Sequence, residues 1–184
     1  MTSNSATTYL ALLRGVNVGG KRLIKMPDLQ AILTESGLDH VRTYIQSGNV
    51  IFSSNKSDTD SLTNQIHVAI EEKIGLDVDV IVFSKPEWVS VVNNAPDWWG
   101  LSKDWKHNLL VILKPFDMNE TIRAIGELNS DIEAIQPGNG VIYQSMSVNL
   151  FGRTTTGKLS SSPIYKRMTV RNYNTVTKLL SLLD

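Results

Sequence analysis

The chain contains no cysteine among its 184 residues, which excludes a disulfide framework, a thiol nucleophile and a cysteine-ligated metal. Its apolar runs are much shorter than the roughly 20 residues that a membrane-spanning helix needs. The N-terminal stretch MTSNSATT lacks the basic start and the apolar centre of a signal peptide. We therefore expect a cytoplasmic protein that does not enter a membrane.

The chain also lacks net charge, because 18 Lys and Arg side chains balance 18 Asp and Glu side chains. This balance argues against a nonspecific nucleic-acid binder, but the charges are unevenly distributed. The net charge is +3 over residues 1–57, −8 over residues 58–133 and +5 over residues 134–184. If the two basic ends meet, they form a positive face suited to an anion; an ordinary mixed surface is the alternative.

The first 85 residues show the order strand, helix, two strands, helix, strand. Apolar periodicity, Gly37, Gly75 and the Ser47-Gly48-Asn49 turn predict these elements. The ranges are a strand at 8–15, a helix at 26–37, a hairpin at 41–54, a helix at 58–74 and a strand at 78–84. This βαββαβ order is that of a ferredoxin-like unit, in which two helices cover one face of an antiparallel sheet.

The rest of the chain repeats this plan, with a strand at 107–115, a helix at 118–128, a hairpin at 132–146 and a closing helix at 175–183. The segment 45–49 (IQSGN) also aligns with 135–139 (IQPGN), which favours an internal duplication over a chance likeness of two turns. The predicted fold class is α+β, with ferredoxin-like subdomains at 1–85 and 106–184. The connector 86–105 contains Trp98, Trp99 and Trp105, which we expect to pack rather than to stack nucleobases.

Two loops have the spacing Gly-x4-Gly-Lys of a phosphate-binding loop, GVNVGGKR at 15–22 and GRTTTGKL at 152–159. Neither has the Ser or Thr that binds magnesium after the lysine, and Pro163 interrupts any helix after the second loop. The sequence therefore argues against an ATPase of the phosphate-loop class. The first loop is either a nest of N–H groups around an anion or a connection that needs glycine for its backbone geometry.

Catalytic and metal-binding side chains are scarce. His40, His67 and His107 share no spacing typical of a metal site or a catalytic base, and we expect each to be a surface or capping residue. The sequence predicts no metal and no cofactor, and it leaves open whether the protein is an enzyme.

The segments LLRGVNVGGK, TYIQSGNVIF and TVRNYNTVTKLL together resemble the bacterial family known as domain of unknown function 1697. The resemblance implies a duplicated α+β fold with two ferredoxin-like subdomains and no established activity. The family-typical positions, together with Lys158 from the second glycine loop, are our candidate ligand-binding residues. These are Arg14, Asn17, Gly19, Gly20, Lys21, Tyr44, Ser47, Gly48, Asn49, Lys158, Arg171, Asn172 and Thr175.

Three functions are compatible with these residues. The first is binding of an anionic, phosphate-bearing small ligand, such as a nucleotide, where the GVNVGGK loop, the SGN turn and the VRNYNT helix start converge. Arg171 at that helix start is expected to face either an anion or an acidic side chain. The second is a metal-independent enzyme at the same site, with Tyr44 as acid or base. The third is a nucleic-acid or protein interaction module that uses a sheet face bearing Tyr44 and Phe52.

Overall fold

The computed structural model describes residues 6–115 and 117–184 and divides the chain into two compact units. Unit 1 comprises Met1–Val89 together with Leu179–Asp184, and unit 2 comprises Ser90–Lys178. Each unit contains one four-stranded antiparallel sheet, so the predicted α+β class with two ferredoxin-like subdomains is confirmed.

Unit 1 has the predicted βαββαβ order, followed by an additional helix. Its elements are β1 (Thr7–Leu13), α1 (Met26–Glu35), β2 (Asp39–Tyr44), β3 (Asn49–Ser54), α2 (Thr59–Ile74), β4 (Val80–Ser84) and α3 (Lys85–Asn93). The strand order is β2-β3-β1-β4. Helix α3 begins in unit 1 and ends in unit 2, within the segment that we predicted to be a connector.

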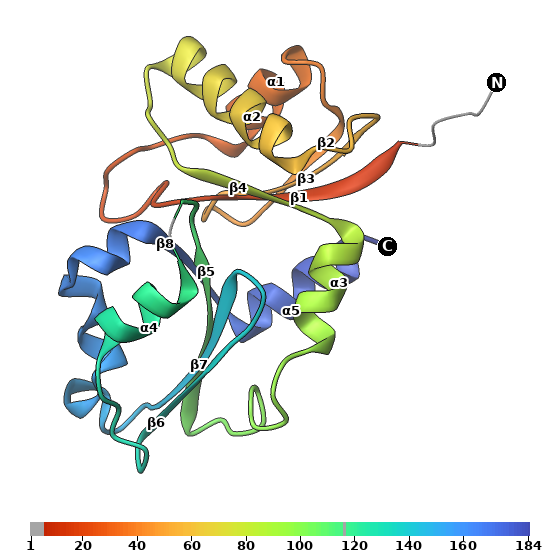
Figure 1. Ribbon diagram of the computed structural model, residues 1–184. Helices are drawn as coiled ribbons and strands as arrows, with labels where there is room; N and C mark the ends of the chain where they lie inside the picture. The colour runs from red at the N-terminus through yellow and green to blue at the C-terminus, as the bar shows by residue number, and fades with distance from the viewer. Residues whose placement is uncertain (1–5, 116) are drawn as a thin grey trace. The chain divides into compact units, whose positions relative to one another are not determined.

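Helices α1 and α2 lie on the same face of this sheet (Figure 1). Asp58 caps α2 by accepting hydrogen bonds from the N–H groups of Asp60 and Ser61, and Gly75 ends the helix at a φ of 66°. Between helices and sheet lies an apolar core that includes Phe52, which is 1% exposed and stacks on Tyr9 at a centroid distance of 5.5 Å. Phe52 is therefore unavailable as a platform for nucleobases.

Unit 2 has the same strand order in its sheet, β6-β7-β5-β8. Its elements are β5 (Trp105–Ile112), α4 (Met118–Ile125), β6 (Glu133–Pro137), β7 (Val141–Ser147), three 3-10 helices (Phe151–Arg153, Thr156–Ser161, Pro163–Arg167), β8 (Met168–Asn172) and α5 (Tyr173–Leu182). The 3-10 helices stand where unit 1 has α2. Pro163 begins the last of them, which agrees with the prediction that this proline prevents a continuous helix.

The two hairpins correspond at a different offset from the one that we predicted. The segments Val50-Ile51-Phe52 and Val141-Ile142-Tyr143 correspond at an offset of 91, since Val50 of β3 pairs with Ala11 of β1 and Val141 of β7 pairs with Val111 of β5. At the predicted offset of 90, Gln46 lies in the turn before β3, whereas Gln136 lies inside β6. The two turns thus differ in length although the strands match.

The tryptophan prediction is confirmed for Trp99, which is buried and makes edge contacts with Tyr143 and Tyr173. Its indole N–H donates to the carbonyl of Asn108 at 3.0 Å. Tyr143 is buried as well, and burial raises the pKa of its hydroxyl, which donates to the carbonyl of Val91. These aromatic rings fill one face of the second sheet.

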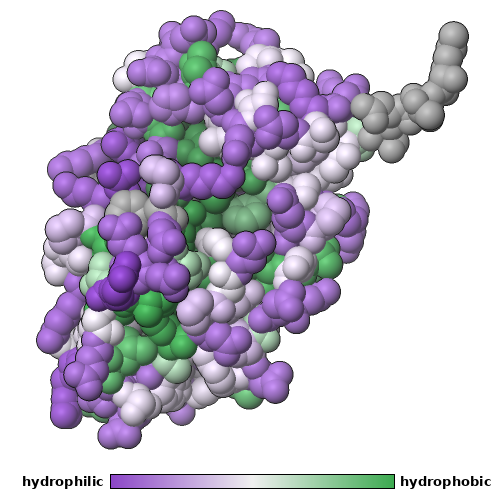
Figure 2. Space-filling view, in the orientation of Figure 1, coloured by the Kyte–Doolittle hydropathy of each residue, from purple (hydrophilic) through white to green (hydrophobic). Residues whose placement is uncertain are grey.

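Hydrophilic residues cover much of the molecular face shown in Figure 2, and hydrophobic residues reach the surface there in patches. Among the helices of the described residues, none is long and apolar enough to cross a membrane.

The turn before β3 depends on glycine at position 48. Gly48 has a φ of 73°, and a Cβ there would lie 2.5 Å from Val16 Cγ2 and 2.7 Å from Leu13 Cβ. Gly75 has a similar φ of 66° with no atom within 4 Å of such a Cβ. We expect Gly75→Ala to lower the free energy of unfolding by about 1–2 kcal/mol through backbone strain. Gly48→Ala should lower it by about 1–3 kcal/mol more, because the core must shift.

Urea unfolding of both variants beside the parent protein measures this difference. Equal stability of the two variants would contradict the close packing of the turn against β1.

Candidate functional site

The first glycine loop is a small hairpin. The Lys21 N–H donates to the carbonyl of Val18 and the Asn17 N–H donates to the carbonyl of Arg22, each at 3.1 Å. Gly19 and Gly20, at the tip, have φ values of 59° and 72°, as a type I′ turn requires. The N–H groups of Asn17 and Lys21 are thus engaged inside the hairpin and are not available as donors to an anion.

The side chain of Asn17 fixes this hairpin to the rest of unit 1. Its Nδ2 donates to the carbonyls of Ile24 and Gln46, and its Oδ1 accepts from the N–H of Ile24, all at 2.9 Å. Asn17 itself has a φ of 55°, which asparagine tolerates better than most residues. One amide group thus connects the hairpin, the approach to α1 and the turn between β2 and β3.

The turn of residues 45–48 is fixed equally well. Asn49, which is fully buried, donates from Nδ2 to the carbonyl of Tyr44 at 2.9 Å and to Ser47 Oγ at 3.0 Å. The carbonyl of Gly48 accepts from the N–H of Leu13 at the end of β1. The structure therefore brings the GVNVGGK loop and the SGN turn together, and it gives Asn17, Gly48 and Asn49 a positioning role.

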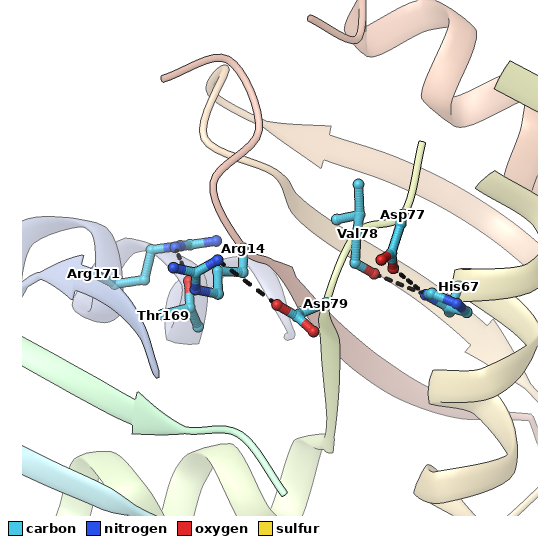
Figure 3. A network of polar contacts seen from close by, with 7 residues as sticks. All are labelled: Arg14, His67, Asp77, Val78, Asp79, Thr169 and Arg171. Atoms are coloured by element: carbon cyan, nitrogen blue, oxygen red, sulfur yellow. Dashed lines mark hydrogen bonds and ion pairs between the residues drawn. The ribbon is translucent and has the colours of Figure 1, made fainter. Parts of the chain in front are cut away.

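Cationic side chains surround the hairpin. Lys21, Arg22 and Lys25 are exposed. Arg14 differs, because its side chain is 19% exposed and its Nη1 lies 3.7 Å from the carboxylate of Asp79 (Figure 3). Of the basic residues near this loop, Lys21, Arg22 and Lys25 are thus presented to solvent, while Arg14 is directed to an acidic neighbour.

A groove of about 740 Å³ lies beside the hairpin in unit 1. Its lining comes from the segment leading into α1, the first turn of α1, the turn before β3 and the end of α2. The lining residues are Asn17, Leu23, Ile24, Lys25, Met26, Pro27, Asp28, Gln46, Ile74 and Leu76. Of these, the candidate list contained Asn17 alone, since the others do not stand in the motifs that suggested a site.

The candidate residues of unit 2 form a second set at the junction of β8 and α5. Arg171 is 6% exposed, and its Nη1 donates to Thr169 Oγ1 at 2.8 Å and to the carbonyl of Val170 at 2.9 Å (Figure 3). Burial lowers the pKa of Arg171 to about 10, so the guanidinium stays charged at neutral pH. Asn172 Oδ1 accepts from the N–H of Thr175 at 2.8 Å and caps α5.

The second glycine loop already holds an anion, the carboxylate of Glu133. This side chain is 1% exposed and accepts from the N–H groups of Asn129, Thr155 and Thr156 and from the Thr156 hydroxyl. Burial alone would raise the pKa of Glu133, but the hydrogen bonds from Thr156, Thr155 and Asn129 outweigh it and lower the pKa. Lys158, the candidate in this loop, is exposed.

His107 is not the surface residue that we predicted, because it is 9% exposed and pairs with Ser145 across β5 and β7. Its Nε2 lies 2.9 Å from the carbonyl of Ser102, which can only accept, so Nε2 carries the proton. In the neutral ring, Nδ1 then accepts from the Ser145 hydroxyl at 2.5 Å. Ser145 is 2% exposed, so this pair stabilises the interior of unit 2 rather than meeting a substrate.

The described residues contain no group of three or more His, Cys, Asp or Glu side chains that could hold a metal ion. The Nε2 of His67 lies 3.6 Å from the carboxylate of Glu71. Its Nδ1 lies 3.0 Å from the carbonyl of Val78 and 4.0 Å from Asp77 (Figure 3).

Comparison with protein families places residues 6–143 on the model described as protein of unknown function (DUF1697). The chain belongs to the DUF1697 family. The glycine hairpin, the SGN turn and Glu133 lie inside the matched residues, whereas the second glycine loop and the Arg171 region lie beyond them.

A solved structure resembles this DUF1697 chain over its length. It is described as the structure of conserved bacterial protein SP0830 from Streptococcus pneumoniae, with 27% sequence identity and a TM-score of 0.87. The match covers 98% of this chain and 100% of that one. A search of curated proteins found no match.

The Glu133 carboxylate should stabilise unit 2. Glu133→Gln replaces one acceptor oxygen by a donor, so we expect the free energy of unfolding at pH 7 to fall by about 1–3 kcal/mol. Because the folded pKa is lowered, this stabilisation is full above the unfolded pKa of about 4.3 and disappears as the pH falls through the folded value. Urea unfolding of parent and variant at neutral and acidic pH measures the effect.

Glu127→Gln is the matched control, since Glu127 is an exposed carboxylate of the same unit. If the two variants were equally stable at pH 7, or if the deficit of Glu133→Gln grew on acidification, the role given to Glu133 would be wrong.

Proposed function

We propose that this protein binds an anionic, phosphate-bearing small ligand through the basic hairpin of unit 1. The observation that carries the proposal is that Asn17 and the hydrogen bonds of the turn hold Lys21, Arg22 and Lys25 on a fixed backbone beside a groove. A hairpin held in this way presents cations without the entropic cost of ordering a mobile loop.

The anion is held by side chains rather than by backbone donors. Arginine binds phosphate oxygens with a planar fork, and lysine binds them as a point charge, so Arg22 and Lys21 together suit a phosphate. Arg14 is directed to Asp79 and supports this site by its charge and by its backbone N–H, which donates to the carbonyl of Asp79 at 2.9 Å.

In unit 2, Arg171 and the start of α5 form a separate candidate for anion binding. Arg171 supplies a cation that stays charged at neutral pH, and Asn172 fixes the backbone from which α5 begins. We also propose that the two units arose by duplication, because their strand orders and hairpin registers correspond.

Removing two cations from the hairpin should weaken anion binding. We expect Lys21→Ala combined with Arg22→Ala to reduce the affinity for inorganic pyrophosphate by tenfold or more, because charge-assisted hydrogen bonds contribute about 1.5–3 kcal/mol each. Arg171→Gln should weaken binding at the candidate residues of unit 2 and leave binding at the hairpin unchanged. Isothermal titration at low ionic strength, with thermal unfolding to confirm that each variant is folded, measures both effects.

Lys56→Ala is the control for loss of charge. Lys56 is exposed and lies just beyond Ser54, at the end of β3 opposite to the SGN turn. The proposal fails if Lys56→Ala weakens pyrophosphate binding as much as the hairpin double variant does. A loss of affinity in the hairpin variant with none in Arg171→Gln would restrict the site to unit 1.

A further inference from the structure

The groove beside the hairpin has a floor and walls that are mainly apolar. Ile24 and Met26, at 4% and 9% exposure, belong to the core of unit 1 and form part of the lining. Leu23 and Ile74 also line the groove but are 69% and 40% exposed. Large aliphatic side chains that are this exposed in a concave surface contribute nothing to the core, which is typical of a ligand-binding site.

The volume of the groove agrees with this interpretation. Small-molecule sites commonly occupy roughly 300–1,000 Å³ and combine apolar walls with a few polar groups. The groove, at about 740 Å³, lies within this range, and its polar lining residues are Asn17, Lys25, Asp28 and Gln46. It is larger than a phosphate group alone would need.

The cations of the hairpin segment favour a ligand with negative charge. Lys21, Arg22 and Lys25 stand in the segment that leads into the groove, and Asp28 is the one acidic residue among residues 15–28. Leu23 directly follows Arg22 in the chain, so an apolar wall and the cationic hairpin belong to one continuous stretch. A ligand with an anionic end and an apolar body is complementary to both.

We propose that the ligand is an amphiphilic phosphate ester, whose aromatic or aliphatic group lies in the groove against Leu23 and Ile74 while its phosphate meets Lys21, Arg22 and Lys25. This inference rests on the proposed function and narrows it. Inorganic phosphate, pyrophosphate and esters of small polyols satisfy the cations but leave the apolar walls exposed to water. They bind more weakly than an ester with an apolar group.

A matched pair of monophosphate esters tests the inference, 1-naphthyl phosphate with a large apolar group and glycerol 3-phosphate with none. We expect the parent protein to bind 1-naphthyl phosphate at least tenfold more tightly, as measured by isothermal titration. Leu23→Ser and Ile74→Ser should abolish most of this preference and leave the affinity for glycerol 3-phosphate unchanged. Both side chains are exposed, so the variants should keep the parent's melting temperature.

Leu101→Ser is the control, because Leu101 is 78% exposed and does not line the groove. Equal affinity for the two esters would overturn the proposal of an amphiphilic ligand, and so would a preference for 1-naphthyl phosphate that survives in Leu23→Ser and Ile74→Ser. Neither result would contradict anion binding by the hairpin. If neither ester bound and the Lys21→Ala, Arg22→Ala variant also bound pyrophosphate like the parent, both the inference and the proposed function would be wrong.

Discussion

The side-chain amide of Asn17 is the interaction on which the site in unit 1 depends. It joins, with three hydrogen bonds, the hairpin, the approach to α1 and the turn before β3. A buried or half-buried polar group is stable only when its donors and acceptors are satisfied, and here one amide satisfies three backbone groups. The positions of Lys21, Arg22 and the groove-lining Leu23 all follow from this connection, because they lie on the short segment that the amide closes.

The two loops with Gly-x4-Gly-Lys spacing use their glycines in different ways. In unit 1 the adjacent pair Gly19-Gly20 makes a tight turn, which engages backbone donors inside a hairpin and leaves the cations outside. In unit 2 the N–H groups of Thr155 and Thr156 do receive an anion, but it is the carboxylate of Glu133 from the same chain. The same spacing therefore forms a hairpin with exposed cations in one unit and a loop that binds the Glu133 carboxylate in the other. The spacing alone cannot identify a phosphate site.

Much of the fold follows from local signals in the sequence. Asp58 and Gly75 bound α2, the apolar alternation gives β1 and β3, and the βαββαβ order then selects the sheet topology. Helix α3 and strand β8 are not predicted, because no turn separates them from a neighbouring element: α3 follows β4 directly at Lys85, and β8 passes directly into α5 at Tyr173. The Gly-Gly pair between Val18 and Lys21 is itself a hairpin signal, so the loop geometry was within reach of the sequence. The groove could not be predicted, because its walls come from the hairpin segment and the end of α2, which are far apart in the chain. The burial of His107 could not be predicted either, because it depends on its cross-strand partner Ser145.

We propose that Asn17 positions the hairpin for an anion, and backbone amide chemical shifts test this proposal most directly. Inorganic pyrophosphate titrated into the ¹⁵N-labelled protein should shift the signals of residues 18–25 in a saturable way. In Asn17→Ala, which keeps every cation, the same residues should shift less at equal pyrophosphate concentration, and the Ile24 amide should exchange with solvent faster. Unchanged titration and exchange in Asn17→Ala, or shifts confined to residues 152–159, would show that the anion binds elsewhere or without this amide.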